Sequence, residues 1–164
     1  MDNGTNPLVD EADENPEANL IAGTWLLKSA VIDNGTATTE VNNSTYSLEY
    51  TATSTNENTE VSFSEAPDRV ISSGDYTMVI NFTFLGVDYS ENITSNTPFS
   101  SGDWSITDNT LKLAANETVN GDYEIVELTE TTLILNAEVN RVIETGGVSL
   151  DTRGTLVITL GKAQ

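Results

Sequence analysis

The chain has 164 residues, with 26 acidic residues, 6 basic residues, no Cys and no His, and its formal net charge is −20. This length fits one domain whose core is large enough to need no disulfide bond. The lack of Cys and His excludes the usual zinc, haem and iron–sulfur ligand sets and also Ser-His-Asp and Cys-His catalysis. The strong negative charge argues against a nucleic-acid partner, because phosphates would be repelled.

Residues 1–19 carry many acidic side chains, two prolines and few apolar residues, which predicts a flexible acidic leader. The leader has neither the basic nor the apolar region of a signal peptide. We expect it to be the tether of an exported protein whose targeting segment has been removed. Residues 20–164 are expected to form one folded domain. No apolar run approaches the roughly 20 residues of a membrane helix, so no transmembrane segment is predicted.

In the first half of the domain, apolar and polar side chains alternate, which is typical of half-buried strands. This alternation predicts strands at residues 25–31, 46–51, 61–63 and 75–85. Asn34-Gly35 predicts a turn after the first of them, because both residue types favour tight turns. Residues 90–102 are mostly polar and contain a proline, so a longer loop is expected there.

In the second half, residues 101–135 read as four short strands joined by tight turns. The expected turns are at Asp108-Asn109, Asn120-Gly121 and residues 129–131. Gly146-Gly147 then predicts a hairpin between the last two strands. Consecutive antiparallel hairpins form a meander, and closing it hides the sheet edges. The sequence therefore predicts an all-β fold, a single antiparallel up-and-down β-barrel of roughly eight to ten strands.

Three short motifs follow one another along the domain: GTWLLKSA at 23–30, GDWSITDNTLKL at 102–113 and YEIVELTETTLIL at 123–135. Together they resemble the lipocalin-like domains of Bacteroidetes envelope lipoproteins. The resemblance implies a calycin-type barrel in an exported protein that is often lipid-anchored. It implies little about the ligand, and the Cys that carries the lipid in such proteins is absent from this chain.

A small barrel is either filled by its own side chains or holds one small ligand. Aromatic residues in phase on the apolar faces are the candidates to line such a cavity, and the alternative is plain core packing. These candidates are Trp25, Tyr46, Tyr50, Phe63, Tyr76, Phe82, Trp104 and Tyr123.

Arg141 is the sharpest single candidate because it is in phase with Ala137 and Val139, on the face expected to point inward. A charge inside a protein is rare unless it is paired. Our hypothesis is that Arg141 faces the cavity and binds the carboxylate of a ligand. The alternatives are a bulge that turns Arg141 outward, or pairing with Glu144 at the rim of the barrel.

The sequence therefore favours a non-enzymatic exported module that binds a small apolar or amphipathic ligand, with no cofactor and no metal site. The first alternative is a structural or protein-interaction domain with a filled barrel. A distant alternative is a carboxylate-based hydrolase, for which Asp88, Glu91 and Asp103 are the obvious acids. No protein partner can be identified from the sequence, and no D-x-D-x-D-G calcium loop is present.

Overall fold

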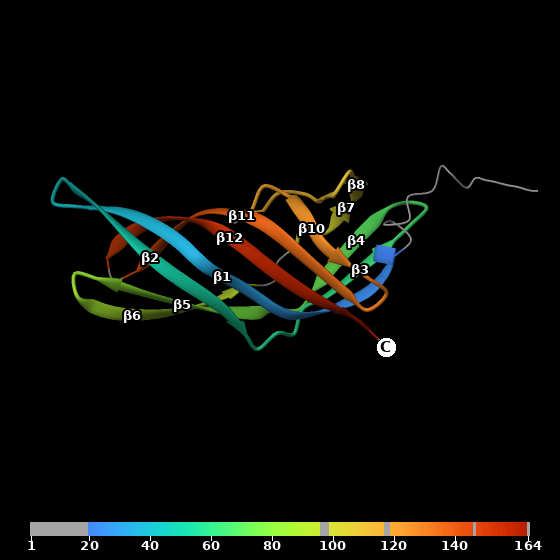
Figure 1. The fold of residues 1–164 in the computed structure, drawn as a ribbon, viewed down its shortest axis with the longest axis horizontal. Coiled ribbons are helices and arrows are strands. Elements are labelled where there is room, and N and C mark those ends of the chain that lie inside the picture. Colours follow the sequence, from blue (N-terminus) through green and yellow to red (C-terminus); the bar gives the residue numbers. More distant parts are fainter. Residues whose placement is uncertain (1–19, 96–98, 117–118, 146, 164) are drawn as a thin grey trace, which may run out of the picture.

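The computed structural model describes residues 20–95, 99–116, 119–145 and 147–163 (Figure 1). The predicted leader, residues 1–19, lies outside the described residues. The described strands are β1 (Gly23–Val41), β2 (Ser44–Thr55), β3 (Glu60–Ser64), β4 (Arg69–Ser73), β5 (Tyr76–Phe84), β6 (Val87–Ser95), β7 (Gly102–Asp103), β8 (Ser105–Thr107), β9 (Thr110–Lys112), β10 (Asp122–Leu128), β11 (Thr132–Thr145) and β12 (Val148–Lys162).

All these strands belong to one antiparallel sheet, which confirms the all-β prediction. The main path through the sheet runs in the order β6-β5-β2-β1-β12-β11-β10-β9-β8. Three short strands lie off this path: β3 pairs with β1 and β4, and β4 also pairs with β7. Long strands such as β1, β11 and β12 run diagonally through the centre of the elongated molecule (Figure 1).

The strand pairings do not close the sheet, in contrast to the predicted barrel. The two ends of the main path, β6 and β8, are not paired with each other. The sheet divides instead at β1, because residues Gly23–Leu26 pair with β3 whereas residues from Val31 onward pair with β2. One arm, β2-β5-β6, and the other, β3-β4-β7, therefore leave β1 toward opposite ends of the molecule (Figure 1).

The turn predicted at Asn34-Gly35 is wrong, because β1 continues through it to Val41. The pairing of β1 with β2 shifts between Ile32 and Gly35, so these residues form an irregularity within the strand. A Cβ atom at Gly35 would lie 2.3 Å from the ring of Tyr50, so the close approach of this ring explains the glycine. The actual turn follows at Asn42 and Asn43, with φ of 52° and 65°.

The later turns agree with the sequence in part. Asp108 has φ of 56° and joins β8 to β9, as predicted. The hairpin between the last two strands is also confirmed by the pairing of Thr145 with Val148, although Gly146 lies outside the described residues. The turn expected at Asn120-Gly121 is a longer connection, because the paired residues flanking it are Lys112 and Asp122.

Two predicted boundaries in the first half also differ from the structure. The loop expected at 90–102 begins later, because β6 extends to Ser95. Strand β4 was not predicted at all, since its sequence, RVISS, is too short and polar to stand out.

The core lies between the inner faces of the curled sheet, where the predicted alternation is clear. In β5, for example, Tyr76, Met78, Ile80 and Phe82 are buried, and the residues between them are more exposed. Burial of these apolar faces is the main favourable contribution to folding. The largest fully buried side chains include Trp25, Tyr123, Phe99, Ile21, Leu111, Leu133, Leu135, Ile158 and Leu160.

Candidate functional site

Trp25 closes one end of the molecule. Its ring is fully buried, and its indole Nε1 donates a hydrogen bond to the carbonyl of Ile21 at 2.8 Å. Lys162 lies over the ring, with Nζ 4.5 Å from the ring centroid, and donates to the carbonyls of Leu20 (3.1 Å) and Ala22 (2.8 Å). Burial lowers the pKa of Lys162. These contacts join the N-terminal and C-terminal segments of the described chain. Trp25 is therefore a core residue here.

Trp104 and Phe63 pack together in the same half of the molecule. Their rings are edge to face, 5.7 Å apart, and both side chains are buried. The indole Nε1 of Trp104 donates to the carbonyl of Ser64 at 2.9 Å, so its polar atom is satisfied within the core. Tyr123 is also fully buried, with its ring 5.2 Å from that of Phe99. Burial raises the pKa of Tyr123, with a smaller contribution from Tyr76.

The other candidates lie toward the opposite end, around a hollow between the arm β2-β5-β6 and the strands β11 and β12. The cavity within this hollow has a volume of about 50 Å³. It is lined by Ile32, Tyr50, Ala52, Tyr76, Met78, Ile80, Ile93, Val139, Arg141, Ile143, Thr152 and Leu156. A smaller hollow of about 10 Å³ shares Tyr50, Ile80, Ile143 and Thr152 with it and is also lined by Phe82 and Glu91.

The structure therefore brings four of the predicted residues together around this hollow: Tyr50, Tyr76, Phe82 and Arg141. Trp25, Trp104 and Tyr123 are core residues elsewhere. Tyr46 is half-buried near the β1–β2 turn, where its ring packs edge to face on Phe84 at 5.6 Å.

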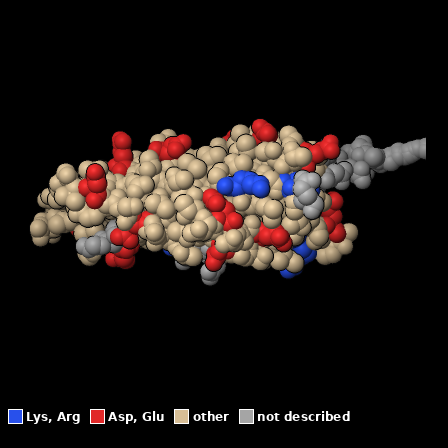
Figure 2. All heavy atoms as spheres, turned by 90° about the horizontal axis from the view of Figure 1, so that it is seen from below, with Lys and Arg blue, Asp and Glu red and all other residues tan. Residues whose placement is uncertain are grey.

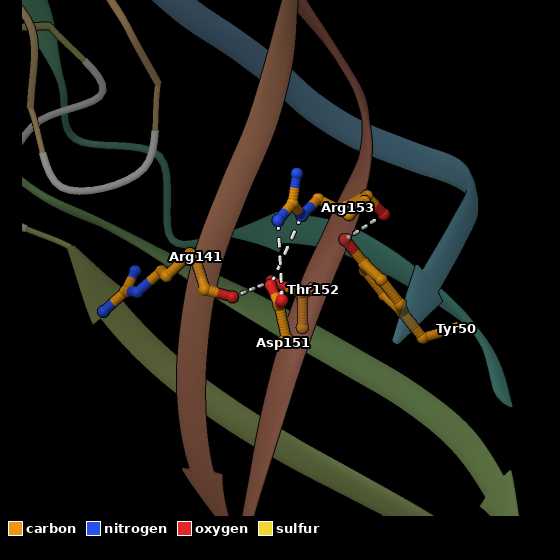
Figure 3. Close-up of polar contacts among 5 residues, drawn as sticks. All are labelled: Tyr50, Arg141, Asp151, Thr152 and Arg153. Atoms are coloured by element: carbon orange, nitrogen blue, oxygen red, sulfur yellow. Dashed lines mark hydrogen bonds and ion pairs between the residues drawn. The ribbon is translucent and has the colours of Figure 1, made fainter. Parts of the chain in front are cut away.

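Arg141 stays in phase with Ala137 and Val139, because β11 pairs with β12 in an unbroken register from Thr132 to Thr145. The bulge considered as an alternative is therefore not present. Glu144, the other alternative, accepts a hydrogen bond from Ser149 across the hairpin. The Arg141 side chain extends from β11 on the side away from β12, and the carbonyl of Arg141 accepts a 2.5 Å bond from the Thr152 hydroxyl (Figure 3).

The neighbouring Arg153 has a different environment. Its guanidinium pairs with Asp151 at 3.3 Å at the surface, and both side chains are about half exposed. Its carbonyl accepts a hydrogen bond from the Tyr50 hydroxyl at 3.1 Å (Figure 3). Burial raises the pKa of Tyr50, and a hydrogen bond with Thr152 partly opposes this. Two arginines on adjacent strands thus lie in contrasting settings, one lining the cavity and one at the surface.

The cavity is bordered by two strand edges without ladder partners among the described residues. Strand β6 pairs with β5 alone. The outer edge of β11 pairs with β10 at residues 133–136 and bridges Val119 at Val139, so residues 140–145 have no partner on that side. Side chains of the lining next to these edges, including Ile93, Arg141 and Ile143, are half-buried rather than buried. We call the boundary between β6 and residues 140–145 the seam.

A second, open groove of about 930 Å³ crosses the outer faces of β1, β2, β5 and β6. Its walls carry exposed polar side chains such as Thr36, Glu49, Asn81 and Asp88. Acidic side chains are spread over the face of the molecule shown in Figure 2, and basic ones are few. The aromatic side chains of Tyr50, Phe82 and Tyr89 also line the groove.

The acids considered for hydrolysis, Asp88, Glu91 and Asp103, lie in three different surroundings. Asp88 accepts a 2.6 Å bond from Thr83, and Asp103 pairs with Arg69 at 3.1 Å at the surface. Glu91 lines the smaller hollow. Within the described part of the chain, no group of three or more acidic side chains is placed to hold a metal ion.

Comparison of the chain with protein-family models, curated proteins and solved structures finds no match. Among the described residues, no helix is long and apolar enough to cross a membrane.

Proposed function

We propose that this protein is a non-enzymatic binding module for a small amphipathic molecule with an anionic head group. The head binds Arg141, and the apolar part enters the cavity between the arm β2-β5-β6 and the strands β11 and β12 of a lipocalin-like curled sheet. The observation that carries this proposal is the position of Arg141, a cation in the lining of an otherwise largely apolar cavity, in a protein of net charge −20.

A half-buried guanidinium beside an apolar lining is partly shielded from water, and charge-assisted hydrogen bonds are stronger in such surroundings. A methionine or leucine in place of Arg141 would supply apolar packing only. A planar guanidinium can bind a carboxylate through two parallel hydrogen bonds, and such pairs are among the stronger polar contacts in proteins. Arg141 therefore has a chemical role that the apolar lining alone would not supply.

The cavity volume limits what can bind without a change in shape. A volume of about 50 Å³ holds a few water molecules, whereas pockets for larger ligands measure about 300 Å³ or more. An alkyl chain would therefore require β6 and β11 to move apart at the seam. This movement breaks no ladder hydrogen bond, because the two edges are not paired with each other.

The second candidate is a structural or protein-interaction domain with a filled interior, and the small cavity volume favours it. The two candidates differ in one respect that can be measured: the first requires a bound amphiphile and a dependence on Arg141, and the second requires neither.

The test is calorimetric titration of the full chain with decanoate and with decanol. We expect decanoate to bind, and Arg141→Met to weaken it at least about tenfold, which corresponds to about 1.4 kcal/mol. Arg153→Met is the matched control, because it removes an arginine from the adjacent strand without touching the cavity, and should leave affinity unchanged. Decanol should bind the original protein and Arg141→Met alike.

Failure of both ligands to bind would support the filled domain. An equal loss of decanoate affinity in the Arg141 and Arg153 variants would show that general charge is responsible. Thermal melts of each variant serve as the check that the fold is intact.

A further inference from the structure

Exposed apolar side chains gather at the end of the molecule opposite β3 and β4. Leu85, Val87 and Tyr89 lie at the hairpin between β5 and β6, and their exposed fractions are 72%, 53% and 41%. This hairpin projects at the end far from β3 and β4 (Figure 1). We call these three residues the apolar tip. Three other exposed apolar residues among the described ones, Ile71, Val126 and Val142, lie on β4, β10 and β11.

The backbone of the apolar tip is strained because a bulky residue, Leu85, occupies a turn position with positive φ. Leu85 and Gly86 have φ of 51° and 81°, and Phe84 pairs with Val87, so the two residues form a tight turn with positive φ at both positions. Such turns prefer Asn-Gly or Asp-Gly, and positive φ is an outlier for a bulky residue. Among the other described residues, those with positive φ that are not glycine are Asn42, Asn43, Asn56, Ala66 and Asp108.

Leu85 therefore lowers the stability of the fold for two reasons. Its conformation costs free energy, and its side chain remains mostly in water, so burial offsets little of that cost. Asparagine at this position would suit the turn better. Backbone strain that the fold does not need is an observation from which a functional role can be inferred.

The shape of the apolar tip and the net charge of the protein limit which partner the tip can contact. Stable interfaces between two protein copies bury about 800 Å² per partner, more than a projecting two-residue turn offers. Two copies that each carry a charge of −20 also repel one another. A lipid–water interface accepts a convex tip and needs only a few inserted apolar side chains. An anionic lipid surface would repel the protein, so the surface must be electrically neutral.

We propose that the apolar tip docks on a zwitterionic lipid surface. The tip is joined directly to the candidate cavity, because the ring of Tyr89 stacks on that of Phe82 at 5.1 Å, and Phe82 lines the smaller hollow. The docked protein would thus present its seam near a source of amphiphiles. Docking itself is independent of the proposed function, whereas the transfer of an amphiphile from the lipid rests on it.

The test is flotation of the full chain with vesicles of phosphatidylcholine, compared with vesicles that also contain phosphatidylserine. We expect binding to phosphatidylcholine and weaker binding when phosphatidylserine is added. Leu85→Asn combined with Val87→Thr should reduce vesicle binding at least about tenfold, given the transfer free energy of two aliphatic side chains. The matched control is Ile71→Thr combined with Val126→Thr, which removes exposed apolar surface elsewhere and should not affect binding.

Leu85→Asn alone should also raise Tm by a few degrees, because it relieves the turn while it removes the docking side chain. Such a gain in stability together with a loss of binding would separate docking from folding. The proposal is overturned if the original protein does not float with phosphatidylcholine, or if the tip and control variants lose binding equally. A dimer that depends on the tip, without vesicle binding, would assign the tip to a second copy instead.

The two proposals fail separately. Decanoate titration without vesicles tests Arg141 whether or not the tip variants bind lipid. Arg141→Met should still float with the vesicles as the original protein does.

Discussion

The two ends of this molecule are built from the same alternating strands, yet they have different interiors. At the Trp25 end, β1 is paired on both sides, by β3 and β12, and the Trp25 ring is fully buried beneath Lys162. At the Arg141 end, the outer edges of β6 and of residues 140–145 have no ladder partner among the described residues, and a hollow lies between them. Alternation alone therefore does not decide whether an interior is filled, since edge pairing also contributes.

The polar groups at the two ends lie in different surroundings. The indole N–H of Trp25 donates to the carbonyl of Ile21, and that of Trp104 donates to the carbonyl of Ser64 on β3. At the other end, the guanidinium of Arg141 is half-buried beside aliphatic side chains of the cavity. The Trp25 end is thus filled by its own side chains, whereas a small hollow lies at the Arg141 end.

The largest expected effect is on the free energy of unfolding, when one side chain is truncated at each end of the molecule. Trp25→Ala should lower the free energy of unfolding by about 3–5 kcal/mol, because it opens a cavity in a filled core. Ile143→Ala, next to an existing hollow and already half-buried, should cost about 1–2 kcal/mol. Urea denaturation of both variants measures the difference. Equal losses would show that the two ends are packed alike.

A smaller loss of folding stability is expected in alkaline solution. Burial raises the pKa of both Tyr50 and Tyr123 above the ordinary value of 10.0. Between this value and the higher folded-state pKa, the folded protein binds more protons than the unfolded chain, so stability falls as pH rises above about 10. The slope is up to about 1.4 kcal/mol per pH unit for each phenol.

Substitution by phenylalanine tells the two phenols apart. Tyr123→Phe should flatten the alkaline decrease more than Tyr50→Phe, because Tyr123 is fully buried whereas Tyr50 lines the cavity. The check is the midpoint of urea denaturation from pH 8 to pH 11. Identical pH profiles for the original protein and Tyr123→Phe would contradict a buried phenol at position 123.

The sequence predicted those features that depend on neighbouring residues. The faces of β5, the turn at Asp108 and the phase of Arg141 follow from local alternation and turn preference, and the structure has all three. Gly35 was misread because its role depends on Tyr50, which reaches it from the paired strand. Glycine in a strand and glycine in a turn have the same local signal.

Features that depend on distant residues could not be read from the sequence. The division of the sheet at β1 requires knowing which strand pairs with each half of β1. The contacts of Lys162 could not be read from the sequence, because its partners Leu20 and Ala22 lie about 140 residues away along the chain. The apolar tip was also missed, since Leu85 read as the last residue of an apolar strand rather than as an exposed turn residue.

The most direct test of the difference between the two ends is amide hydrogen exchange followed residue by residue, with and without decanoate. We predict that β6 and residues 140–145 exchange orders of magnitude faster than the β1 residues around Trp25, and that decanoate slows exchange at the seam alone. Uniform protection along both ends, unchanged by decanoate, would contradict an opening cavity at Arg141.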